Sequence, residues 1–341
     1  MENEGMSSVV FSPHRRVLWR RFLEYGLTLF VVISFNFLLP RLLPGSPFSY
    51  LSGEAQADLP LPGDAAYRAY LEDYYGLNRP LLQQYALYWL NLARGDLGLS
   101  YYYQVPVLAL LARRIPWTLA LAVASLFTAL LLAMYFGVQA AWQQGHNLDR
   151  RLLTVFISLR TIPSFFLGVI LLLLFGYHLN LFPLSGALSP GQIYRHPWEL
   201  ALDYLEHFFL PYLTLTLFLT PGLFLTVRSS VLGVLGEDFL QVARLRGLPE
   251  GVLKFRYALR NALLPVLTQA AMRLGHSLGG AILVENVFSY PGMGKLLQEA
   301  LAMRDYPVLQ GIFLLVTVGI LLANLVMDLL YPRLDPRLAA Q

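Results

Sequence analysis

Six apolar runs dominate this sequence and limit the folds that it can adopt. Each is close to or longer than the roughly 20 residues that an α-helix needs to cross a bilayer, and they cover residues 22–40, 117–141, 153–182, 208–227, 263–284 and 308–330. Soluble domains rarely contain such runs, and the alternation with period two that is typical of membrane β-strands is absent. We therefore expect an all-α polytopic membrane protein with six transmembrane helices.

The distribution of basic residues predicts the orientation of these helices. One set of helix ends carries 14 Lys and Arg residues and the other carries nine, spread over more residues. Because cytoplasmic loops are enriched in Lys and Arg, both termini should be cytoplasmic. The net charge of +4 then reflects topology and contact with anionic lipids, and we expect no nucleic-acid partner. The chain has no cysteine, which excludes disulfides and thiolate metal sites.

The runs divide the chain into a short series of segments. We expect a cytoplasmic N-terminus, a first transmembrane helix, a long external loop with amphipathic helices, a five-helix core and a cytoplasmic C-terminus, at residues 1–21, 22–43, 44–116, 117–331 and 332–341. In the external loop, Tyr85, Trp89 and Leu92 have helical spacing, as in a helix that lies at the membrane interface. Pro163 should kink the third run.

A dense polar block, "EDFLQVARLRGLPEGVLKFRYALRN", interrupts the apolar core at residues 237–261, inside a cytoplasmic loop at 228–262. A helix should begin near Asp238, where negative charge suits the helix dipole, and Gly247 followed by Pro249 should end it. A second short helix is expected at 250–261. The first helix has an apolar stripe formed by Phe239, Leu240, Val242 and Ala243. Capped helices in a loop of this length are better explained by docking of a cytoplasmic partner than by a solvated connection.

The same block resembles the EAA loop of ABC-importer permeases. In "QVARLRG", Gln241 stands at the position of the family's Glu, Val242 and Ala243 at its two alanines, and Gly247 at its glycine. The family's Leu-Pro pair matches Leu264 and Pro265 in "ALRNALLP", at the longer spacing of the dipeptide, oligopeptide and nickel branch. The stretches "ARGDLGLSY", "RRIPWTLAL", "LRTIPSFFLG" and "ENVFSYPGMGKLL" extend this similarity over nearly the whole chain.

This resemblance implies a MetI-like type I importer fold and a non-catalytic permease subunit in a bacterial or archaeal cytoplasmic membrane. It implies half of a translocation path for di- or oligopeptides or, alternatively, for nickel chelates or another small solute. The implied partners are a second, homologous permease, one or two ATPase subunits that carry ATP and Mg²⁺, and an extracytoplasmic solute-binding protein. No cofactor is expected on this chain. The residues implied to couple it to the ATPase are Asp238, Phe239, Gln241, Val242, Ala243, Arg244, Arg246, Gly247, Leu248, Arg260 and Pro265.

Among the ionisable residues inside apolar runs are Arg160, Arg273 and His276. Such residues usually face a bundle interior or a water-filled path, so they either line the translocation path or serve a structural role. For a structural role, an ion pair with Glu285 or Asp328, or snorkelling of Arg160, is possible. The segment "GMGK" at 292–295 lacks both the upstream Gly and the following Ser or Thr of a P-loop, and the histidines form no metal-binding pair.

Two functions of other classes fit the apolar runs as well. An ion-coupled secondary transporter or channel would take up its substrate without ATP, but it leaves the capped cytoplasmic helix unexplained. A membrane scaffold or receptor would use that helix for docking and would transport nothing.

Overall fold

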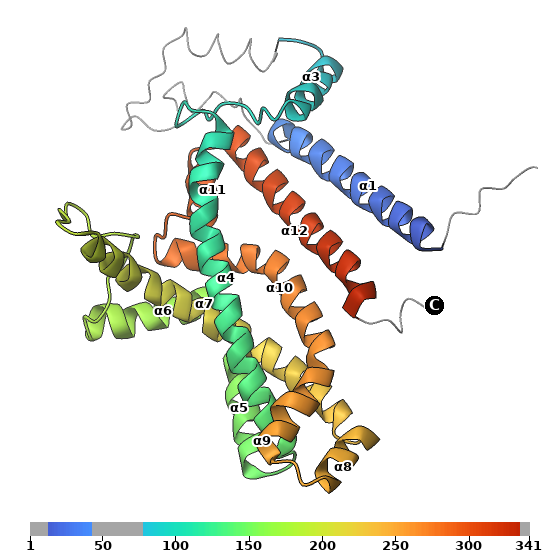
Figure 1. The fold of residues 1–341 in the computed structure, drawn as a ribbon. Coiled ribbons are helices and arrows are strands. Elements are labelled where there is room, and N and C mark those ends of the chain that lie inside the picture. Colours follow the sequence, from blue (N-terminus) through green and yellow to red (C-terminus); the bar gives the residue numbers. More distant parts are fainter. Residues whose placement is uncertain (1–12, 43–77, 335–341) are drawn as a thin grey trace, which may run out of the picture. The chain divides into compact units, whose positions relative to one another are not determined.

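The computed structural model describes residues 13–42 and 78–334, and these residues form helices and connecting turns with no β-strand (Figure 1). The long helices are α1 (Pro13–Leu42), α4 (Val107–Trp142), α7 (Pro197–Val234), α10 (Leu259–Val287) and α12 (Tyr306–Leu334). The shorter elements are α3 (Leu81–Ala93), α5 (Asn147–Arg160), α6 (Ser164–Leu171), the π-helix η1 (Leu172–His178), α8 (Asp238–Leu245), α9 (Glu250–Val252), the π-helix η2 (Leu253–Ala258) and α11 (Met293–Ala302).

Helices α4, α7 and α12 are long and apolar enough to cross a membrane. The third predicted run is not one straight helix, because α5 and the helix formed by α6 and η1 meet at 99°. Pro163 explains this break: it has no N–H to donate and disfavours helical backbone in the residue before it. If this bent pair counts as one span, the described residues contain four candidate spans. By helix length and composition, this is fewer than the six transmembrane helices that we predicted.

One compact unit contains α1, α3 and Phe313–Leu321. Aromatic side chains join α3 to α1, because Phe30 stacks on Trp89 at 5.6 Å between ring centroids and Phe37 meets Tyr85 edge-on at 5.1 Å. A hydrogen bond of 2.7 Å between the hydroxyls of Ser34 and Tyr85 adds a polar contact. The helix predicted around Tyr85 and Trp89 is therefore confirmed, whereas residues 43–77 of the predicted external loop lie outside the described residues.

The other unit is built on the close packing of α4 against α7. Small residues recur every fourth position along one face of α4, and all of them are buried: Ala129, Ala133, Gly137 and Ala141. Such a stripe lets two helix backbones approach closely. At Gly137 even a methyl group would lie 2.7 Å from the Val227 side chain. On the same two helices, Ser125 donates to the Tyr212 carbonyl at 3.3 Å, and Tyr212 donates to the Thr128 hydroxyl at 2.7 Å.

A buried carboxylate, Glu285 near the end of α10, fixes the turn into α11. It accepts hydrogen bonds from the Thr118 hydroxyl at 2.6 Å and from the Gly294 N–H at 2.6 Å. Side chains added at Gly292 or Gly294 would collide with this carboxylate, and one at Gly294 would also meet the Ile282 backbone. The glycines of "GMGK" therefore serve close packing, in agreement with the rejection of a P-loop there.

Two further acids organise loops at the same end of this unit. Asp203 accepts from the Ser189 N–H at 2.7 Å and from the Tyr194 hydroxyl at 2.6 Å. Asp305, which is fully buried, accepts from the Ser100 hydroxyl at 2.5 Å and the Tyr102 N–H at 3.1 Å. Burial raises the pKa of Asp305, and the hydrogen bonds from Ser100 and Tyr102 oppose that rise. Asp305 connects segments that are 205 positions apart in sequence, whereas Asp203 holds the loop just before α7.

Candidate coupling surface

Helix α8 presents one apolar face to the rest of the chain and another to solvent. Leu240 is fully buried and Ala243 is 3% exposed, whereas Phe239 is 38% and Val242 is 47% exposed. Leu245, which the sequence analysis did not single out, is 88% exposed. Because successive residues turn by about 100° around a helix, the stripe that we predicted divides between two faces. Asp238 lies in the first turn, where its charge suits the helix dipole.

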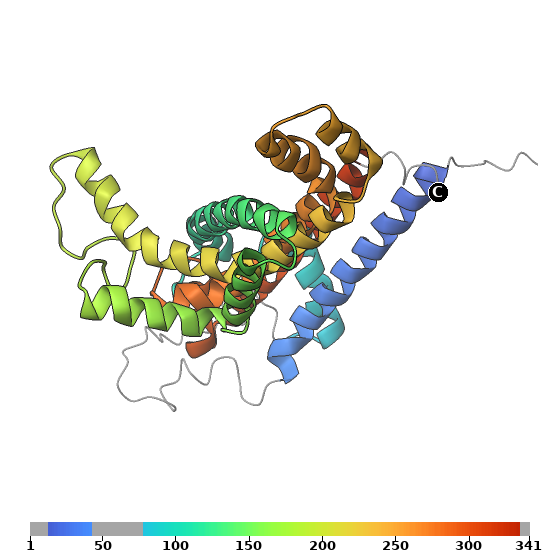
Figure 2. The same ribbon diagram turned by 90° about the horizontal axis from the view of Figure 1, so that it is seen from below.

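The buried face of α8 joins a hydrophobic cluster that spans four longer helices. Leu240 and Ala243 belong to one cluster with side chains of α4, α5, α7, η2 and α10, including Ala141, Phe156, Val231, Leu253 and Ala262. Figure 2 views the chain from the end that carries α8 and α9. Because packed side chains resist independent movement, a displacement of α8 should be passed to the ends of α4, α7 and α10.

The turn after α8 has the geometry that the sequence predicts. Gly247 has φ of +71°, a left-handed conformation that glycine adopts without strain, and its N–H donates to the Arg244 carbonyl at 2.9 Å. Leu248 is partly buried in the cluster described above. The second short helix predicted at 250–261 is wrong as a separate element, since α9, η2 and α10 follow one another without a break through Pro265.

Basic residues of this loop have two kinds of environment. Arg244 and Lys254 lie over the ring of Trp142 at the end of α4, at 5.0 and 5.5 Å from its centroid. Lys254 also donates to the Gln139 side chain at 3.3 Å. These cation–π contacts attach both sides of the turn to α4. The other coupling-loop residues Gln241, Arg246, Arg260 and Pro265 are exposed.

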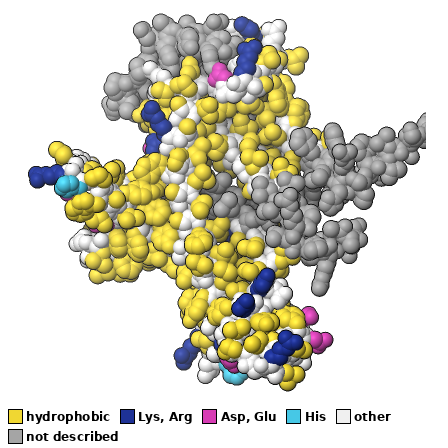
Figure 3. Space-filling model, in the orientation of Figure 1, with side chains coloured by type: hydrophobic (Ala, Val, Ile, Leu, Met, Phe, Trp, Pro, Cys, Tyr) yellow, Lys and Arg dark blue, Asp and Glu magenta, His cyan; other side chains and the backbone are white. Residues whose placement is uncertain are grey.

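Charged side chains gather around this loop, as they do at other ends of the helices, and leave the surface between them apolar. In the face shown in Figure 3, hydrophobic side chains cover most of the visible length of α4, and Lys, Arg, Asp and Glu side chains gather near α8 and α9. Charge is expensive in the hydrocarbon layer, so this end of the unit is suited to water and to a water-soluble partner.

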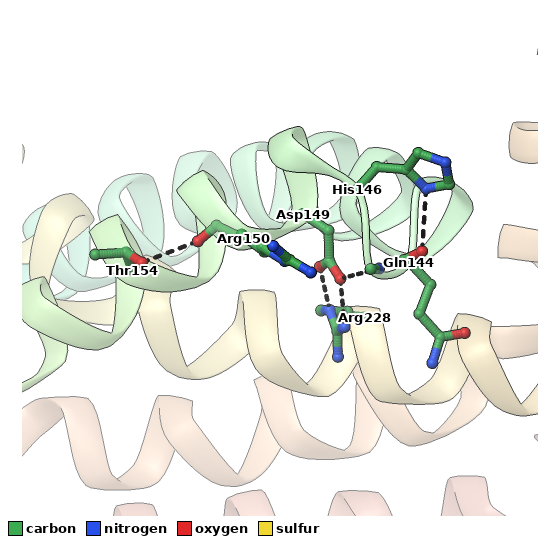
Figure 4. Close-up of polar contacts among 7 residues, drawn as sticks. Gln144, His146, Asp149, Arg150, Thr154 and Arg228 are labelled. Carbon is green, nitrogen blue, oxygen red and sulfur yellow. Dashed lines mark hydrogen bonds and ion pairs between the residues drawn. The ribbon is translucent and has the colours of Figure 1, made fainter.

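A buried ion pair beside this surface was missed by the sequence analysis. Asp149, which is 2% exposed, accepts two hydrogen bonds from the Arg228 guanidinium at 2.7 and 2.8 Å, and one from the Gly145 N–H at 3.0 Å (Figure 4). The pair connects the first turn of α5 to α7 ten residues before α8 begins. In the sequence analysis, Arg228 served only as one of the 14 basic residues that predict the membrane orientation. An acid standing alone among basic residues in "HNLDRR" was the available signal.

The three intramembrane residues lie apart from this surface. Arg273 packs against the backbone of Gly222 on α7, and its buried Nε has no hydrogen-bond partner. Arg160 is exposed at the end of α5, near enough for its charge to repel that of Arg273. An ion pair of Arg273 with Glu285 is not formed, because Glu285 bonds to Thr118 and Gly294. The side chains of His276 and Asp328 lie outside the described residues.

The described residues contain no group of three or more His, Asp or Glu side chains that could hold a metal ion. Among them, His207 contacts Asp203, one turn away, through the carbonyl at 2.8 Å and the carboxylate at 3.5 Å. The Asp203 carboxylate also accepts hydrogen bonds from Ser189 and Tyr194 of the preceding loop.

Comparison with known proteins gives consistent matches. Residues 129–340 match the family described as binding-protein-dependent transport system inner membrane component. The chain is 36% identical to a di/tripeptide transport system permease protein of Pseudomonas aeruginosa, over 92% of this chain and 96% of that protein. It is 35% identical to a glutathione transport system permease protein of Escherichia coli K12, over 91% and 94%. A probable peptide ABC transporter permease protein of Sinorhizobium fredii is 33% identical, over 94% and 97%.

Proposed function

Because this chain belongs to the family of binding-protein-dependent transport system inner membrane components, we propose that it forms half of the translocation path of an ATP-driven peptide importer. As a permease subunit it carries out no ATP hydrolysis; ATP and Mg²⁺ would bind to partner ATPase subunits. Family membership also argues against an ion-coupled transporter, a channel acting alone or a receptor. The second half of the path would come from a homologous permease.

The exposed face of α8 is the observation that carries this proposal. Phe239, Val242 and Leu245 offer an apolar surface to the solvent, while Leu240 and Ala243 fix the same helix to the membrane helices. A helix of this kind fits a groove on a partner protein. ATP-dependent closure of two ATPase subunits would move α8, and its buried face would pass that movement to α4, α7 and α10.

The docking proposal can be tested with two matched substitutions. Leu245→Gln changes a side chain that is 88% exposed, and Ile193→Gln changes one that is 89% exposed in the loop before α7. Neither substitution removes buried packing. The tagged chain, purified in mild detergent, should lose the ATPase with Leu245→Gln and keep it with Ile193→Gln, while the second permease is retained in both. Equal retention of the ATPase would contradict docking through α8.

We propose the finer topology from the charge distribution and the family. The chain would have six spans with both termini in the cytoplasm, so α8 and the Asp149–Arg228 pair would face the ATPase. The loops at 44–116, 183–207 and 286–307 would face a solute-binding protein on the other side. The ordered contacts of Asp203, Glu285 and Asp305 support this role, because they hold the described parts of these loops as fixed surfaces.

We propose that the transported substrates are small peptides. The three relatives described above are named for di/tripeptide, glutathione and peptide transport, and none of those three names refers to nickel. Uptake of a labelled tripeptide by the assembled importer, in competition with unlabelled peptides or nickel chelates, tests this assignment. Competition by nickel chelates alone would favour the alternative substrate class.

We also propose that Arg160, Arg273 and His276 line the translocation path. Two arginines without acidic partners among the described residues, close to a helix break, are typical of a polar route through a membrane protein. Transport at the wild-type rate by Arg273→Ala, in a complex that assembles normally, would contradict this role.

A further inference from the structure

The guanidinium of Arg273 occupies an unusual position on the inner side of α10. It lies so close to Gly222 that a methyl group added there would be 2.7 Å from its Cζ and 3.0 Å from its Nη1. Gly222 follows Pro221, which has no N–H and leaves one carbonyl of α7 without its helical hydrogen bond. The guanidinium therefore lies directly against Gly222, a position on α7 that is buried and has no side chain.

The depth of this position follows from the contacts of α7 with α4. Tyr212 lies beside Ser125, and Val227 lies beside Gly137. Gly222 falls between Tyr212 and Val227, so it lies beside the middle of the apolar run 117–141. The Arg273 guanidinium is therefore near the midplane of the predicted membrane, where importers with broken helices commonly bind their substrates.

No acidic side chain of the described residues pairs with Arg273 or Arg160. Arg160 ends α5 at the 99° break, and its charge repels that of Arg273. A charged group in a membrane interior is costly without a counter-charge. Two positive charges without an acidic partner among the described residues therefore favour an anion beside Arg273.

We propose that Arg273, assisted by Arg160, binds the C-terminal carboxylate of the peptide as it passes the midplane. This inference rests on the proposed peptide-import function. A carboxylate is the one anion that every free peptide carries whatever its side chains, and the guanidinium fork matches it with two parallel hydrogen bonds. A translocation path that binds the C-terminal carboxylate can accept peptides of many sequences and still exclude solutes without a negative charge.

The test compares a tripeptide with its C-terminal amide, which keeps the charged amino terminus but has no carboxylate. The complete importer is reconstituted in proteoliposomes, and uptake of trialanine is compared with that of trialanine amide, each presented on the binding protein at equal occupancy. Any preference of the binding protein itself for one of the two peptides is the same in every variant, because the same binding protein is used throughout. This preference therefore cancels when the acid-to-amide uptake ratio of a variant is divided by that of the wild type. Arg273→Gln should lower the acid-to-amide uptake ratio by about tenfold, the loss expected for one charge-assisted contact. Arg273→Lys should retain part of the preference.

Other outcomes separate this inference from the proposed function. An equal fall in uptake of both peptides with Arg273→Gln would overturn it, since a purely structural role or pairing with a carboxylate of the second permease predicts that result. If Arg273→Gln fails to assemble, Arg160→Gln changes an exposed residue and should shift the ratio in the same direction; an unchanged ratio would overturn the proposal. ATP-independent uptake by the wild type would instead contradict the proposed function.

Discussion

Two arginines in this chain show how strongly the surroundings of a charge decide its role. Arg228 is held by two hydrogen bonds to Asp149 and connects α7 to the first turn of α5. Arg273 has a buried nitrogen without a hydrogen-bond partner among the described residues. A satisfied buried pair fixes structure, whereas an unsatisfied charge requires a ligand.

Removal of Asp149 should therefore destabilise the end of this unit that carries α8. Asp149→Ala leaves the partly buried Arg228 without its counter-charge, and we expect a loss of about 3 kcal/mol. The neighbouring Arg150 is exposed, so Arg150→Ala should change stability by less than about 0.5 kcal/mol. Thermal unfolding of both variants in detergent measures the difference. Equal midpoints would show that the ion pair contributes nothing.

Two glycines should respond in opposite directions to the same change. Gly294→Ala forces a methyl group to within 2.9 Å of Glu285 Oε2 and closer still to the Ile282 backbone, so we expect a loss of about 2 kcal/mol. Gly233 lies in α7 with nothing within 4 Å, so Gly233→Ala should stabilise the helix by about 0.5–1 kcal/mol. If Gly294→Ala unfolded at a higher temperature than Gly233→Ala, the close approach at Gly294 would be wrong.

The sequence predicted part of the coupling surface at residue level. Gly247 and Pro249 were identified because turn chemistry is local. Leu245 and Asp149 were missed for a different reason: whether a leucine is exposed, or an acid meets an arginine 79 positions away, depends on tertiary packing. Periodicity gave the apolar character of α8 but could not show which part of its stripe faces outward.

At the scale of elements, proline separates two helices at one position and lies inside a continuous helix at others. Pro163 separates two helices at 99°, whereas Pro211, Pro221 and Pro265 lie inside continuous helices. The kink predicted at Pro163 is confirmed. The other three prolines lie in helices surrounded by neighbours, which tolerate a lost hydrogen bond. The predicted end of a helix near residue 261 is wrong, because packing continues along α10.

Trp142 should be needed to hold α8 and the turn after it in place. Trp142→Ala removes the ring beneath both Arg244 and Lys254, and each cation–π contact contributes about 0.5–1 kcal/mol at such a site. Amide hydrogen exchange in residues 238–252 should then accelerate by about tenfold, while exchange in α3 stays unchanged. Trp142→Phe, which keeps an aromatic face, should lie between the two. Unchanged exchange in Trp142→Ala would contradict the role of the ring.

At the scale of the whole molecule, the central claim is that this permease subunit turns ATP hydrolysis on partner subunits into peptide import. The most direct measurement is uptake of a labelled tripeptide into proteoliposomes that contain this chain, its second permease, the ATPase subunits and the binding protein. We predict uptake with ATP on the ATPase side, none with a non-hydrolysable analogue, and loss of ATP-driven uptake with Leu245→Gln. Uptake that proceeds without ATP, or with this chain alone, would contradict the account.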